Sequence, residues 1–175
     1  MRTATWILLP SLVLTLLAGI SHAAGDTTPL PASVTADLKS VADMCREVGG
    51  SPNTDEAVKS SDLNADGQAD FVLFVGSVMC DGAASVYGDR MKEVHVYAGD
   101  GRGGAREAFV DLVYGMLIEG TGSTARVWLT VSGKQCGKPP APNFASESFC
   151  QRALAWNAAS GRFDYAPVST VRMIE

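Results

Sequence analysis

Oxygen-bearing side chains recur at close intervals in one short segment of this chain, residues 62–70. Calcium is a hard cation that takes six to eight oxygen ligands, and a tight turn brings alternate side chains to one side of the backbone. A glycine at the sixth position, Gly67, permits such a turn. The spacing therefore predicts calcium as a cofactor. The predicted ligands are Asp62, Asn64, Asp66, the backbone carbonyl of Gln68, and Asp70 directly or through a water.

The stretch Asp62–Leu73 resembles the calcium loops of exported FG-GAP and VCBS-type proteins and, more distantly, the EF-hand. The resemblance implies the same five ligands. An EF-hand has a bidentate Glu at position 12, where this chain has Leu73, and FG-GAP loops occur in repeats whereas this chain has one copy. The chain is also similar to small uncharacterised exported bacterial proteins in which such a loop precedes a strand and a Cys-Asp/Glu-Gly-Ala-Ala segment, here Cys80–Ala84. That second resemblance implies no activity.

The same segment has a metal-free interpretation. Asp, Asn and Gly favour turns without any ion, because their side chains bond to the nearby backbone or tolerate left-handed conformations. The alternative to a calcium site is therefore an Asx-rich turn.

The four cysteines are Cys45, Cys80, Cys136 and Cys150, and an even count in an exported chain predicts two disulfides. Zinc is the competing explanation, but the sequence has no CxxC pair, and His95 is the only histidine after the first 23 residues. Of the three possible pairings we favour Cys45 with Cys80 and Cys136 with Cys150. The second pair closes a proline-rich loop of about 15 residues, which would contribute ~3 kcal/mol.

The first 23 residues have the three parts of a secretory signal peptide: a short basic start, an apolar run from Trp6 to Ile20, and the triplet Ser21-His22-Ala23. We predict cleavage after Ala23. The apolar run is shorter than the ~20 residues of a spanning helix, so a membrane anchor is the less favoured interpretation. The sequence thus predicts a periplasmic or secreted protein.

The negative net charge of the chain limits the classes of molecule that it could bind. The chain has a formal net charge of −5, which becomes one unit more negative when Arg2 is removed with the signal peptide. Acidic surfaces repel nucleic acids and anionic membranes. We therefore expect an unknown protein or envelope component as partner, no nucleic acid, and no membrane span after cleavage.

The hydrophobic pattern predicts an α+β fold in a single small domain, residues 34–175, after a mobile lead-in of residues 24–33. Apolar residues at spacings of three and four indicate one helix from Val34 to Val48, capped by Ser33 and ended by Gly49 and Gly50. Period-two or short apolar runs then predict strands of a mostly antiparallel sheet. These runs lie within residues 71–75, 94–98, 109–118, 127–131 and 154–165, the last of them a hairpin.

No segment carries a recognisable catalytic motif, so we predict no enzyme activity. Residues 99–104 match GxGxxG, but a strand rather than a helix is expected next, which favours a glycine-rich hairpin loop over a dinucleotide site. His95 alternates with valines and is expected to face solvent.

Together these observations predict an exported, disulfide-stabilised domain with a calcium-binding loop and a binding or structural role. The alternative is an extracytoplasmic inhibitor or envelope protein partner without metal. In that case the acidic loop would be only a turn, and a sheet face or the loop closed by Cys136 and Cys150 would make the contact.

Overall fold

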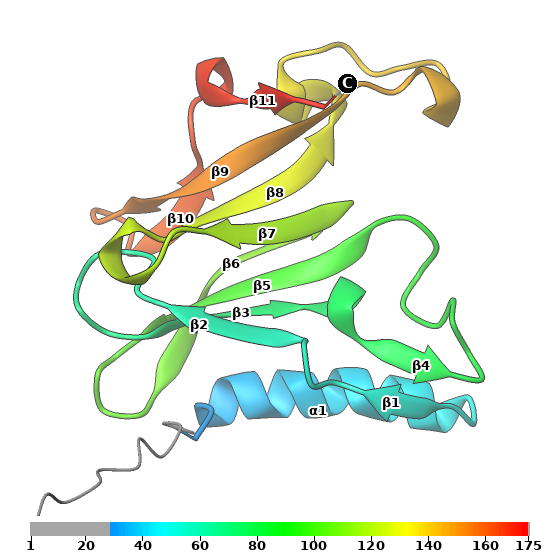
Figure 1. Ribbon diagram of the computed structural model, residues 1–175, viewed down its shortest axis with the longest axis vertical. Helices are drawn as coiled ribbons and strands as arrows, with labels where there is room; N and C mark the ends of the chain where they lie inside the picture. Colours follow the sequence, from blue (N-terminus) through cyan, green and yellow to red (C-terminus); the bar gives the residue numbers. More distant parts are fainter. Residues whose placement is uncertain (1–28, 175) are drawn as a thin grey trace, which may run out of the picture.

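A computed structural model describes residues 29–174 as three layers, with one helix beneath two β-sheets (Figure 1). The predicted signal peptide and the first part of the predicted lead-in lie outside the described residues. In the described part, one helix is followed by mostly antiparallel strands, which confirms the predicted α+β class. No helix within residues 29–174 is long and apolar enough to cross a membrane.

Helix α1 (Ala32–Glu47) buries Val34, Val41 and Cys45 of the predicted apolar stripe. Leu38 is partly buried, and Val48, which lies just after the helix, is 57% exposed. The predicted cap is wrong by two positions, because Pro31 occupies the N-cap and Ser33 lies in the first turn. The Ser33 hydroxyl donates instead to the carbonyl of Ala105, at 2.7 Å, because the sheet packs directly against this turn. The helix ends where the predicted glycines begin.

The first sheet has the order β2-β3-β5-β6, with every neighbouring pair antiparallel. Its strands are β2 (Val58–Ser61), β3 (Asp70–Phe74), β5 (Lys92–Gly99) and β6 (Ala105–Val113). All five residues of β3 are buried, because α1 covers one face of this sheet and the second sheet covers the other. The nearly continuous apolar run that follows the acidic loop is therefore an interior strand, as predicted.

The second sheet has the order β10-β9-β8-β7, and β11 also pairs with β9. Its strands are β7 (Gly115–Glu119), β8 (Arg126–Ser132), β9 (Phe149–Asn157), β10 (Arg162–Tyr165) and β11 (Arg172–Met173). Strands β9 and β10 form the predicted terminal hairpin. The segment expected at residues 109–118 is divided between β6 and β7, and the chain passes from one sheet to the other between them.

The remaining elements are short. A separate ribbon pairs β1 (Ser51–Asn53) with β4 (Met79–Asp81) beside the end of α1. Single 3-10 turns occupy Val75–Ser77, Gly122–Thr124, Gly133–Cys136, Phe144–Ser146 and Val168–Thr170.

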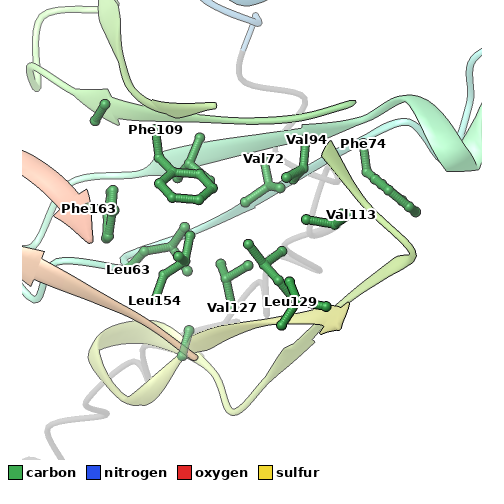
Figure 2. Packing of buried hydrophobic residues seen from close by; sticks show 14 of the residues in the cluster. Leu63, Val72, Phe74, Val94, Phe109, Val113, Val127, Leu129, Leu154 and Phe163 are labelled. Atoms are coloured by element: carbon green, nitrogen blue, oxygen red, sulfur yellow. The ribbon is translucent and has the colours of Figure 1, made fainter. Parts of the chain in front are cut away.

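Two hydrophobic clusters hold the layers together. One lies between the sheets, where Val72 and Val94 of the first sheet face Val127 and Leu129 of the second (Figure 2). The other lies between α1 and the first sheet, and Tyr97 is one of its largest members. The first sheet is therefore buried on both faces over much of its area, which limits where polar side chains can reach it.

Both favoured disulfides are present. Cys45 of α1 is bonded to Cys80 of β4, and Cys136 is bonded to Cys150 of β9. A Cβ added at Gly50 would lie only 2.4 Å from the Cys80 sulfur, so glycine at this position lets the chain pass close to the first bridge. Disulfides of this kind are typical of proteins from oxidising compartments.

Candidate metal-binding sites

The acidic loop connects β2 to β3 and is held at one point by the hydrophobic core. Leu63 is 7% exposed and packs in the cluster between the two sheets (Figure 2). Ala65 and Gly67 both have left-handed backbones, with φ of 62° and 82°. The two left-handed residues lie on either side of Asp66, so the backbone turns tightly around this residue.

Oxygens from two predicted ligands converge inside this turn. Oδ1 of Asp62 and Oδ1 of Asn64 accept from the same donor, the backbone N–H of Asp66, at 3.1 and 2.9 Å. The other oxygen of Asp62 accepts from the N–H of Gly67 at 3.1 Å. Oδ1 of Asp66 accepts from the N–H of Gln68 at 2.8 Å. The side chains at positions 62, 64 and 66 thus fold back onto their own loop.

Asp70 has a different environment from the other predicted ligands. Its side chain is fully buried, and Oδ2 accepts from the N–H groups of Leu63 at 2.8 Å and Asn64 at 3.1 Å. Oδ1 accepts from the N–H of Gly99 at 3.0 Å, which ties the loop to β5. Burial raises the pKa of Asp70, and the three N–H donors oppose that rise. Asp70 is therefore an anchor of the loop.

The glycine-rich segment forms the hairpin loop that the sequence predicts, closed between Asp100 and Gly104. It lies directly against the acidic loop. A Cβ at Gly99 would be 2.1 Å from the carbonyl oxygen of Ala69, and one at Gly101 would be 2.6 Å from the side-chain oxygen of Gln68. These glycines permit close contact between two loops, which gives the GxGxxG spacing a structural role.

A second group of ligand-type side chains lies on the opposite face of the first sheet. Asp37 of α1, His95 of β5 and Glu107 of β6 place ligand atoms within 4.8 Å of one another. Within residues 29–174, the carboxylates of the acidic loop do not bring three ligand atoms within 4.8 Å of one another. Nδ1 of His95 lies 2.9 Å from Oε2 of Glu107, and Nε2 lies 3.3 Å from Oε2 of Glu93.

The expectation that His95 faces solvent is wrong. Its side chain is only 15% exposed, because α1 covers the sheet face opposite the valines. The alternation of side chains along the strand correctly places His95 on the face opposite Val94 and Val96. It does not predict that α1 covers the face on which His95 lies. The helix sequence contains a signal that a polar group faces the sheet. Asp37 lies three residues after Val34 and four before Val41, on the buried side of the helix.

A groove lies between the edges of the two sheets formed by β2 and β7. It has a volume of roughly 610 Å³, and its lining includes Ser61, Met116 and Ile118. Among the strands of residues 29–174, β2 pairs with β3 alone and β7 pairs with β8 alone. Each strand therefore presents one unpaired backbone edge to this side of the molecule.

Comparison with known proteins gives no relative from which a function can be transferred. No protein-family model matches the chain, and neither a curated protein nor a solved structure matches it. The function must therefore be inferred from the chemistry of the two candidate sites.

Proposed function

We propose that this chain is an exported domain, stabilised by its two disulfides, that binds calcium through residues 62–70 and has a binding or structural role. The observation that carries the proposal is the convergence of Asp62 and Asn64 oxygens on one backbone N–H, that of Asp66. Two oxygens that accept from one donor lie on the same side of the turn, and rotation of both side chains away from that donor would let them contact one cation. The disulfides support export, because such bonds persist in oxidising compartments.

The donor set suits calcium better than magnesium. Asp62, Asn64 and Asp66 would supply side-chain oxygens, and Gln68 would supply its carbonyl. Asp70 would act through a water, since its own oxygens already accept N–H bonds. Water would complete the six to eight ligands that calcium takes, and such partly hydrated sites in extracellular modules bind with Kd of ~10⁻⁴ to 10⁻³ M. Magnesium demands a tighter octahedral shell.

Bound calcium would stabilise the fold because the loop leads directly into β3. A ligand that binds only the folded state adds RT ln(1 + [L]/Kd) to the free energy of unfolding, about 1.4 kcal/mol at ten times Kd. Fixing the loop would fix the entry of a fully buried strand. The effect would raise the melting temperature of a domain of this size by several degrees.

The test is a thermal melt of the purified protein in excess chelator and in millimolar calcium, paired with calorimetric titration. Asp66→Ala should abolish the shift, because it removes a carboxylate at the centre of the turn. Asp89→Ala is the matched control, since Asp89 is exposed and lies outside the loop. Magnesium should give a smaller shift. Identical melts with and without calcium, and no heat of binding, would refute the proposal.

A second candidate function is supported by the groove between β2 and β7. Free strand edges bind extended peptides through backbone hydrogen bonds. An inhibitor or envelope partner without metal would use this groove, and calcium would then have no effect on its binding. This candidate becomes the better one if the calcium test fails.

A further inference from the structure

We propose that Asp37, His95 and Glu107 bind a divalent transition-metal ion of the zinc class at the junction of α1 and the first sheet. The site is separate from the acidic loop, and the proposal does not depend on calcium binding there. It comes from three elements that are distant in sequence, since Asp37 lies on α1, His95 on β5 and Glu107 on β6.

The spacing of the donor atoms suits a single small ion. Two ligands at ~2.1 Å from a tetrahedral zinc ion are ~3.4 Å apart. The Nδ1 atom of His95 lies 2.9 Å from Oε2 of Glu107, and an oxygen of Asp37 is within 4.8 Å of the other ligand atoms. To reach this spacing, the contact between His95 and Glu107 would open by about half an ångström, and an oxygen of Asp37 would move inward by at most about 1.4 Å. All three side chains are at least partly accessible, so an ion can enter.

The surroundings supply an independent argument. A histidine that binds metal through one nitrogen almost always donates its other N–H to a carboxylate, a carbonyl or water, and ligating carboxylates are themselves hydrogen-bonded. Here Nε2 of His95 faces Oε2 of Glu93 at 3.3 Å, and the Tyr97 hydroxyl donates to Oδ2 of Asp37 at 2.6 Å. Both supports of a metal site are therefore in place around the ligands.

The net charge of these side chains also favours a bound cation. The carboxylates of Asp37, Glu93 and Glu107 surround one imidazole, and no Lys or Arg within residues 29–174 forms an ion pair with any of them. Even a protonated ring would leave the group with excess negative charge. A bound dication would neutralise it.

The mixed donor set selects the class of ion. Imidazole nitrogen suits zinc and its transition-metal neighbours, whereas calcium and magnesium prefer oxygen alone. Three protein ligands leave the fourth tetrahedral position for water or an external ligand. The bound ion would link α1 to β5 and β6, and would strengthen the packing of the helix on the sheet.

The experiment is calorimetric titration of the purified protein with zinc chloride alone, in buffer without calcium, together with thermal melts. We expect one zinc per chain and a higher melting temperature. Glu107→Gln and His95→Gln should each weaken zinc binding at least tenfold, and Glu93→Gln should weaken it by roughly tenfold through the supporting bond. Glu107 is exposed, so its variant should fold normally, which a melt in chelator checks.

Two controls separate this site from others. Glu47→Gln, on an exposed position of the same helix, should bind zinc as the wild type does. Asp66→Ala should keep the zinc response whatever happens to the calcium response. The absence of saturable zinc binding, or zinc binding that persists unchanged in both His95→Gln and Glu107→Gln, would overturn the proposal.

Discussion

The hydroxyl of Tyr97 donates a 2.6 Å hydrogen bond to Asp37, and so joins a buried strand to the helix that covers it. The ring is 1% exposed and the two residues are 60 positions apart in the chain. Burial, the accepting Asp37 carboxylate and its negative charge raise the pKa of Tyr97, so the phenol stays protonated at neutral pH and remains a donor.

Replacing this hydroxyl should weaken the contact between helix and sheet. We expect Tyr97→Phe to lower the free energy of unfolding by about 1–2 kcal/mol, because a hydrogen bond to a charged acceptor is lost while the ring remains. Urea denaturation measures the change. Tyr114→Phe is the control, since no hydrogen bond of the Tyr114 hydroxyl is found among the described residues, and it should change stability by less than about 0.5 kcal/mol. Equal effects of the two substitutions would contradict the assignment.

Much of the fold could be predicted because local patterns determined it. The spacing of Val34, Val41 and Cys45 identified the helix and its buried face, and the run after Asp70 identified the interior strand. The disulfide pairing could also be predicted, because Cys136 and Cys150 close a short proline-rich loop, which leaves Cys45 to pair with Cys80. Each of these inferences used residues close together in the chain.

The sequence predicts the ligands of the acidic loop but not the second candidate site, and the difference has a physical reason. The loop ligands lie within nine positions, so their spacing was informative, but the role of Asp70 depends on Gly99, which belongs to another strand. The group of Asp37, His95 and Glu107 was missed because it depends on how the helix crosses the sheet. Sequence periodicity gives the face on which a residue lies but not the element that covers that face.

Asp70 should be sensitive to replacement of its carboxyl group, because the two oxygens of that group accept three backbone N–H bonds. In Asp70→Asn, an NH₂ group replaces one acceptor oxygen and leaves at least one buried N–H without a partner. We expect a loss of about 1–3 kcal/mol in the free energy of unfolding. The measurement is urea denaturation in chelator, with the exposed Asp89→Asn as control.

The same variant gives a pH test with a definite sign. Burial raises the folded-state pKa of Asp70 above the ordinary value of 3.8, so the folded state binds this proton more readily than the unfolded state does. The stability that Asp70 contributes is then fully present below the unfolded pKa and is lost as pH rises through the folded pKa. The difference between wild type and Asp70→Asn should therefore be largest below about pH 4 and smaller at about pH 7. A difference that grows with pH would contradict a raised pKa.

Two residues of the acidic loop, Ala65 and Gly67, should change stability in opposite directions when they are substituted. Ala65 has φ of 62°, and within residues 29–174 it is the one non-glycine residue with positive φ. Gly67 has φ of 82°, and a Cβ added there would meet no atom within 4 Å, so a substitution would strain only the backbone. A left-handed conformation costs an L-residue about 1–2 kcal/mol, partly offset by the lower entropy of the unfolded chain.

Ala65→Gly should therefore raise the free energy of unfolding by about 0.5–1 kcal/mol, and Gly67→Ala should lower it by about 1 kcal/mol. Both are measured by urea denaturation in chelator, where calcium plays no part. With calcium present, Gly67→Ala should also weaken calcium binding, because Asp62 Oδ2 bonds to the N–H of Gly67 and the turn must keep its shape for the oxygens to converge. If the two substitutions change stability in the same direction, the left-handed turn around Asp66 is not the conformation of this loop.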